Sequence, residues 1–135
     1  MGVCVFVASG LNFDVDGYLQ KSPFKAVSVF RKGHIPPKDN PQHQPRPDSG
    51  FVVLVAQSPD LGLSLEISEA LKFLHKHEQE ILHLKNYGVD NALFDFGVEH
   101  QGMIQEAKYL PPELIAALAR FGMGLIFSTV QFPKG

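Results

Sequence analysis

Two stretches of the chain are unbroken apolar runs that predict buried β-strands. Residues 2–8 read Gly-Val-Cys-Val-Phe-Val-Ala, and residues 51–56 read Phe-Val-Val-Leu-Val-Ala. Such runs are too short for a membrane span, and their β-branched content favours a strand with both faces largely covered. We expect both to be central strands, with the rest of the chain packed around residues 51–56 and the helix that follows them.

Three further stretches predict strands with a more polar pattern. Residues 92–98 alternate, with Phe94 on one side and Asp95 on the other, which is typical of an antiparallel strand with one open face. Residues 25–31 and 124–132 are the remaining strands. One face of the sheet should therefore be more open than the other.

A long helical segment is predicted from residue 65 to about residue 86. Ser64 is the expected N-cap, and Gly88 is the expected C-terminal cap. Polar residues interrupt the apolar stripe at residues 76–78, so we expect a break or kink there. The residues expected to be buried are Ile67, Ala70, Leu71 and Leu74 before the break, and Ile81, Leu82 and Leu84 after it.

The predicted order of elements is β-α-β-β-α-β-α-β. A short helix at residues 15–20 should be capped by Asn12 or Asp14, and another should begin at Pro111–Pro112. This order predicts a ferredoxin-like α+β sandwich extended by one helix and one strand, with a mainly antiparallel five-stranded sheet and helices on one face. The length of 135 residues predicts one domain covering residues 1–135.

Between two predicted strands, residues 33–49 have a different composition. This stretch holds five prolines and a single aliphatic residue, Ile35. It should form a long flexible loop with polyproline-like character. Two interpretations are open: a solvated insertion, or a loop that contacts a partner or covers a site.

Composition excludes several classes of function. With 44% apolar and 19% charged residues and a net charge of −2, the chain lacks the concentrated basic charge that nucleic acids or anionic membranes require. It shows no apolar run long enough for a membrane helix and no secretory signal, so we expect a cytoplasmic protein. The lone cysteine, Cys4, lies in a predicted core strand, so we interpret it as a small core residue rather than a reactive thiol.

No motif predicts a metal site, a cofactor or a catalytic residue. His75 and His77 would point about 200° apart on a helix, and the Glu80-x-x-His83 spacing occurs only once, whereas bundle metal sites use it in pairs. The serines lack the Gly-x-Ser-x-Gly context of a nucleophile elbow. Helix capping explains the remaining acidic pair, Asp14 and Asp16, better than acid–base chemistry.

Asp95 is the most interesting acid because it interrupts an aromatic strand. If it points onto the open sheet face near Ser28 and Ser128, then its carboxylate, these hydroxyls and Arg31 could hold a polar ligand or contact a partner. The alternative is a solvent-facing aspartate on a half-exposed strand. The candidate contact residues are Ser28, Arg31, Lys32, His34, Asp95 and Ser128.

Three segments together resemble a family of small bacterial domains of unknown function. They are Leu11-x-Phe13-Asp14-x-Asp16-x-x-Leu19, Val29-Phe30-Arg31-Lys32-Gly33, and Pro112-Glu113-Leu114-x-x-x-Leu118-Ala119 followed by a Gly-x-Gly-Leu-x-Phe strand. The resemblance implies a ferredoxin-like fold, and some members lie near toxin-immunity genes. It implies no catalytic residues, and the proline-rich loop departs from the family pattern.

Our leading hypothesis is a non-enzymatic protein-interaction module, with an immunity-like role as one form of it. The contact surface would be the open sheet face with the loop at residues 31–49, and the partner would be another protein or a second copy of the chain. The alternatives are a small-molecule-binding or enzymatic domain with a cleft near Asp95, and a purely structural accessory domain.

Overall fold

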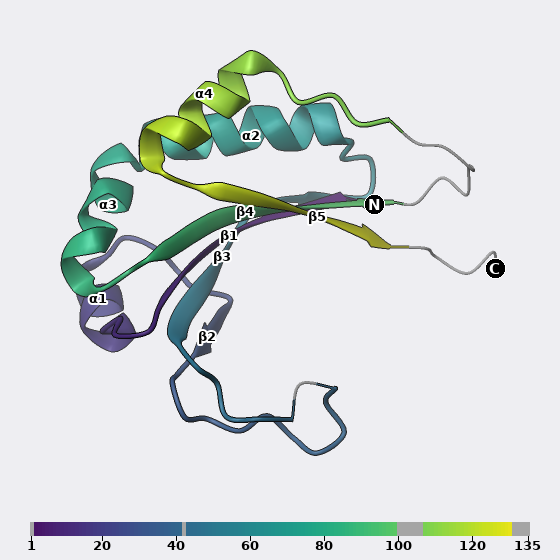
Figure 1. The fold of residues 1–135 in the computed structure, drawn as a ribbon. Coiled ribbons are helices and arrows are strands. Elements are labelled where there is room, and N and C mark those ends of the chain that lie inside the picture. Colours follow the sequence, from purple (N-terminus) through teal and green to yellow (C-terminus); the bar gives the residue numbers. More distant parts are fainter. Residues whose placement is uncertain (1, 42, 100–106, 131–135) are drawn as a thin grey trace.

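The computed structural model describes residues 2–41, 43–99 and 107–130, which form an α+β fold built on a five-stranded sheet (Figure 1). The strands are β1 (Gly2–Gly10), β2 (Ser28–Phe30), β3 (Ser49–Ser58), β4 (Asn91–Glu99) and β5 (Gly124–Val130). The helices are α1 (Val15–Lys21), α2 (Leu63–Lys76), α3 (Glu78–His83) and α4 (Pro112–Phe121), with a 3₁₀ turn, η1 (Leu84–Tyr87), after α3.

The two apolar runs form interior strands, as predicted. The strand order is β2-β3-β1-β4-β5, and β1 pairs in antiparallel fashion with both β3 and β4. The register of β1 with β3 shifts by one residue at Cys4–Val5, because Cys4 pairs with Ala56 whereas Val5 pairs with Leu54. Val55 is therefore the extra residue of a bulge, which returns Ala56 to the face that Cys4 shares.

The sheet is mixed rather than mainly antiparallel, which corrects the sequence prediction. Strands β4 and β5 pair in parallel, with Phe94 opposite Leu125 and Phe96 opposite Phe127. Helix α4 joins the two strands, and a helical crossover returns the chain to the end of the sheet where β4 began. The alternation at residues 92–98 indicates an open face but carries no information on the direction of the neighbouring strand.

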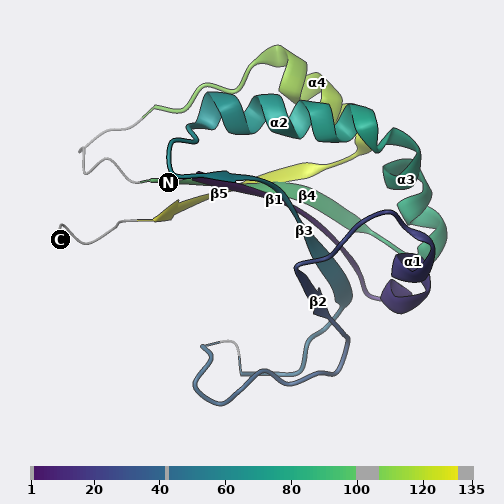
Figure 2. The ribbon, with the colours of Figure 1, turned by 180° about the vertical axis from the view of Figure 1, so that it is seen from behind.

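The helices lie on one side of the sheet. Figures 1 and 2 show α2 and α4 over one face, while α1 and α3 close one end of the structure. The residues that β1, β3 and β4 direct toward these helices, such as Cys4, Phe51 and Phe94, have no exposed surface. None of the four helices covers the opposite face in the two views.

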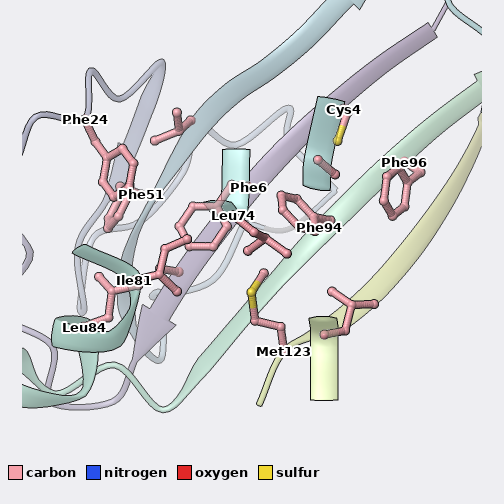
Figure 3. Close-up of a cluster of buried hydrophobic side chains, with 14 of the residues drawn as sticks. Cys4, Phe6, Phe24, Phe51, Leu74, Ile81, Leu84, Phe94, Phe96 and Met123 are labelled. Atoms are coloured by element: carbon pink, nitrogen blue, oxygen red, sulfur yellow. The ribbon is translucent and has the colours of Figure 1, made fainter. Parts of the chain in front are cut away.

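Phe6 lies at the centre of an aromatic core (Figure 3). It has no exposed surface, and its ring centroid lies 5.4 Å from that of Phe73 on α2. Three more rings surround it, those of Phe94 at 5.9 Å, Phe24 at 6.0 Å and Phe51 at 6.2 Å. Close aromatic pairs add to the stability that burial of their area provides. This cluster fixes α2 against the middle of the sheet.

The predicted interruption of the long helix is confirmed. Helix α2 ends at Lys76, α3 begins at Glu78, and Gly88 caps η1 in the left-handed conformation with φ 97°. Two details of the prediction are wrong. The N-cap is Gly62, two residues before Ser64, and Leu82 is 44% exposed rather than buried.

The strand predicted at residues 25–31 is much shorter, because β2 spans three residues. The preceding segment leaves the sheet at Phe24, whose ring stacks on Phe73 at 5.6 Å and is buried. One backbone bond, from Val27 N–H to the Val52 carbonyl at 2.8 Å, extends the pairing with β3. Anchoring of Phe24 in the core therefore limits the length of this edge strand.

Strand β5 is described to Val130, and residues 131–132 of the predicted strand lie outside the described residues. In the described part of the chain, no helix combines the length and the apolar character needed to cross a membrane.

Two glycines in the left-handed conformation allow a matched test of the fold. Gly88 has φ 97° and lies against the Asn12 carbonyl, whereas Gly33 has φ 87° and open space around it. Left-handed backbone costs a residue with a Cβ roughly 1–2 kcal/mol. We expect Gly33→Ala to lower the free energy of unfolding by about 1 kcal/mol, and Gly88→Ala by at least about 2 kcal/mol because a clash is added.

Urea denaturation of the two variants and the wild-type protein measures this difference. Equal losses for Gly33→Ala and Gly88→Ala would show that η1 does not press against residues 12–13 as described.

Candidate functional site

The structure brings two of the six predicted contact residues together. The Ser128 hydroxyl on β5 donates to the Asp95 carboxylate on β4, with distances of 2.7 Å to Oδ1 and 3.0 Å to Oδ2. Both residues are half-buried, and they face away from the helices because their neighbours Phe94 and Phe127 pack into the core. Asp95 thus lies on the open face, as expected, with Ser128 beside it.

The other four predicted residues lie at the opposite edge of the sheet. Ser28 belongs to β2, which β3 and β1 separate from β4. Arg31 instead binds Asp16, with its Nε 3.0 Å and its terminal nitrogen 2.7 Å from the two carboxylate oxygens. These hydrogen bonds lower the pKa of Asp16. A single pocket built from Asp95, Ser28 and Arg31 is therefore absent from this arrangement.

Lys32 and His34 belong to a closed turn at the base of the proline-rich loop. The backbone N–H of Lys32 donates to Ser49 Oγ at 2.9 Å. The N–H of Gly33 donates to the Arg46 carbonyl, and that of Arg46 to the His34 carbonyl, both at 2.9 Å. The loop base is therefore tied by backbone bonds, which leaves the Lys32 and His34 side chains exposed.

The Arg46 side chain connects this turn to the open face of the sheet. Its guanidinium carbon lies 4.2 Å from the centroid of the Phe30 ring, and its terminal nitrogen lies 3.5 Å from Asp48 Oδ1. The Phe30 ring in turn covers Gly50, on the face of β3 that carries Val52 and Leu54. Cation–π contact of this kind holds a positive charge beside the sheet surface.

Between these two edges the open face is aliphatic. Its side chains alternate with the core residues of the same strands, and most are half-buried, but Leu54 is 41% and Ile126 46% exposed. We call this surface the open sheet face, and its aliphatic residues are Val3, Val5, Val7, Val52, Leu54, Leu93 and Ile126.

Sequence reasoning missed a buried carboxyl group. Glu66 in the first turn of α2 has no exposed surface, and neither carboxylate oxygen has a hydrogen-bond partner among the described residues. Burial raises its pKa to about 7, and the negative charge of Asp95 acts in the same direction. The sequence did contain a signal, because Glu66 lies four residues before Ala70 on the helix stripe that faces the sheet.

Cys4 lies in the same part of the core. It is fully buried, as predicted, and burial raises the pKa of its thiol to about 12, with smaller contributions from the charges of Glu66 and Asp95. A thiol with this pKa is almost never ionised at neutral pH and is therefore a poor nucleophile.

The histidines that the structure describes do not converge on an ion. His77 packs between Phe24 and Phe73, with both centroid distances 4.8 Å, and desolvation lowers its pKa. Among the residues that the structure describes, no three His, Cys, Asp or Glu side chains are grouped so as to hold a metal. His77 is thus packed against the edge of the core.

Comparisons with known proteins found no similar protein. No protein-family model matches the chain, and no match was found among curated proteins or solved structures. The resemblance to small bacterial domains stays a prediction, and the site is interpreted from its geometry.

The buried Glu66 makes stability depend on pH. Its pKa is 4.5 in the unfolded chain and about 7 in the fold, so the folded state retains a proton that the unfolded state loses. The contribution of Glu66 to stability is therefore most favourable below pH 4.5, falls as the pH rises to about 7, and does not change further above that pH. Since one pKa unit corresponds to about 1.4 kcal/mol, ionisation of Glu66 should lower the free energy of unfolding by up to about 3 kcal/mol between pH 4.5 and pH 7.

The Glu66→Gln variant should lose this decrease in stability between pH 5 and pH 8. Urea unfolding at the two pH values measures the free energy of unfolding. The matched control is Glu69→Gln on the same helix, whose carboxylate lies 3.4 Å from Lys72 Nζ. The control should keep the wild-type pH dependence. If Glu66→Gln and Glu69→Gln behave alike, the carboxyl group of Glu66 is not desolvated in the fold.

Proposed function

We propose that the protein is a non-enzymatic protein-interaction module whose contact surface is the open sheet face. One observation carries this proposal: the helices cover one face of the sheet, while the other presents aliphatic side chains from four adjacent strands. The largest exposed apolar patch of a soluble protein is often functional, and larger patches mark interaction sites.

A second copy of the chain is the partner that this surface fits best. The negative charge, Asp95, lies toward the β4–β5 edge. At the β2 edge Arg46 lies over Phe30 and is paired with Asp48, so the net positive charge there is that of the loop at residues 31–48, with four Lys or Arg residues against two Asp. A twofold axis near β1 would place the acidic edge of each copy over the basic edge of the other. Isologous interfaces require this kind of self-complementarity.

The loop at residues 31–48 supports the same arrangement. Its sequence carries four Lys or Arg residues and two Asp residues, and its described part projects from the β2–β3 end on the side away from α2 and α4 (Figures 1 and 2). It therefore extends the positive edge on the side where a second sheet would pack, about 10 Å away.

The size of the surface predicts a weak complex. The five strands lie about 4.8 Å apart and, apart from the three-residue β2, span seven to ten residues, which at about 3.3 Å per residue gives a sheet face of roughly 500 Å². Stable interfaces bury about 800 Å² on each partner, so we expect a dissociation constant in the micromolar range or weaker.

We also infer that β1 to β4 follow the ferredoxin-like arrangement. The strand order β2-β3-β1-β4 with antiparallel neighbours supports this inference, and α4 with β5 is then the extension. A ferredoxin-like domain with an immunity-like role, as the resemblance to small bacterial domains implies, would use such a face to bind another protein. A cytoplasmic location belongs to the same proposal.

A small-molecule site centred on Asp95 has less support. Arg31 is engaged with Asp16, and Ser28 lies at the far edge of the sheet. Of the predicted contact residues, only Ser128 lies beside the Asp95 carboxylate. One hydroxyl group does not make the set of converging polar groups that a small-molecule site needs.

Self-association can be tested with matched charge insertions. Leu54→Glu and Ile126→Glu each place a carboxylate on the open sheet face, at sites that are 41% and 46% exposed. The control variants Leu65→Glu and Ile115→Glu each place a carboxylate on a helix instead, α2 and α4 respectively, at sites that are 58% and 53% exposed. We expect the first pair to weaken self-association at least about tenfold and the second pair to leave it unchanged.

Sedimentation velocity between about 1 µM and 1 mM protein measures the dissociation constants. Asp95→Asn should also reduce the dependence of the wild-type constant on salt concentration, because it removes the acidic edge. A wild-type protein that stays monomeric over this range, or equal weakening by all four insertions, would reject the proposed contact surface.

A further inference from the structure

A groove lies on the helix side of the sheet, away from the open sheet face. It encloses about 740 Å³ between the first half of α2 and the segment that leads into α4. Volumes of roughly 300–1,000 Å³ are typical of small-molecule sites. None of the contact residues predicted from the sequence lines it.

The groove exists because the side chains on the α2 wall are small and the backbone of the opposite wall is extended rather than helical. Ser64 and Ser68 lie one turn apart on α2, and their small side chains leave room beside the helix. On the opposite wall, Pro111 is extended, with φ −68° and ψ 151°, and α4 begins only at Pro112. The chain before Pro112 therefore passes α2 without packing helix against helix.

The walls are mostly aliphatic. Leu63, Ile67 and Leu71 from α2 face Tyr109 and Pro111 across the groove. Ile67 also belongs to the core, so this wall is fixed by the packing of α2 on the sheet. Tyr109 is 75% exposed, which places it at the rim. Such walls offer a flexible hydrocarbon apolar contact along its length, with one aromatic ring, Tyr109, at the rim.

The charged side chains of the groove favour an anion. Lys72 and Lys108 line it together with a single acid, Glu113. Lys72 lies 3.4 Å from Glu69, but its side chain is 71% exposed, and exposed pairs of this kind hold a lysine only weakly. Among the groups that line the groove, two ammonium groups against one carboxylate leave one positive charge, and an anionic ligand would replace Glu69 as the partner of Lys72.

We propose that this groove binds an aliphatic carboxylate, meaning a single anionic head group on an unbranched hydrocarbon tail. The tail lies against Leu63, Ile67 and Leu71, and the head group accepts hydrogen bonds from Lys72 and Lys108 Nζ. The site is independent of the proposed dimer, because it lies on the opposite side of the sheet from Leu54 and Ile126.

The test uses sodium decanoate, titrated into the full chain and followed by isothermal titration calorimetry. We expect saturable binding with one site per chain below the concentration at which decanoate forms micelles. The double variant Lys72→Gln/Lys108→Gln should weaken binding at least about tenfold, since it removes both charge partners. The matched control, Lys76→Gln/Lys85→Gln, removes two lysines that do not line the groove and should bind decanoate like the wild type.

Two further measurements separate the tail from the head group. Decanol has the same tail without the charge, so it should bind more weakly to the wild type and equally to the wild type and the Lys72→Gln/Lys108→Gln variant. Ser68→Phe fills the groove and should abolish decanoate binding, with circular dichroism confirming that the variant is folded. The same titration in the Leu54→Glu background should give unchanged affinity, which distinguishes this site from the dimer surface.

Equal decanoate binding by the two double-lysine variants, or binding only above the micellar concentration, overturns the proposal. So does a folded Ser68→Phe variant that keeps decanoate binding. If Ser68→Phe instead weakens self-association, and decanoate also weakens self-association of the wild type, then the groove binds a second copy of the chain. The assignment to a carboxylate would then be wrong.

Discussion

The packing of Phe6 against the rings of Phe24, Phe51, Phe73 and Phe94 is the contact on which the rest of the structure depends. These rings come from the two central strands, from β4, from α2 and from the segment before β2, so one cluster fixes most of the chain. Because β1 alternates, burying Phe6 on the helix side commits Val5 and Val7 to the other side. The aliphatic open sheet face is thus a direct consequence of the aromatic core.

The same helix that completes this core also carries its least favourable group. Glu66 is buried beside Cys4 without a hydrogen-bond partner in the described part of the chain, and burial of an unpaired carboxyl group lowers stability unless it is protonated. Asp95, on the other side of the sheet, still raises the pKa of Glu66. The open sheet face and the core are therefore coupled electrostatically, since a cation bound near Asp95 would ease the ionisation of Glu66.

The sequence determined those features that depend on local patterns. The apolar runs located β1 and β3, the polar interruption before Glu78 located the end of α2, and Gly88 was identified as a cap because left-handed backbone favours glycine. The features that failed depend on long-range geometry. Glu66 fits both the helix-dipole rule and the buried stripe, and only the tertiary contact decides between them. Likewise, Ser28 and Ser128 are equivalent in the sequence pattern, and only the strand order separates them.

The two proposed sites use opposite faces of the sheet for a physical reason. The open sheet face is flat and rigid, because backbone pairing fixes its strands, and such a surface suits another extended surface. The groove is concave because Pro112 disfavours helical backbone at Pro111, so α4 starts only at Pro112 and the chain before it leaves the space beside Ser64 and Ser68 unfilled. Ile67 lines the groove and also packs in the aromatic core that positions β1. A ligand in the groove would therefore stabilise the same core that presents the open sheet face, without touching the residues that contact a second copy.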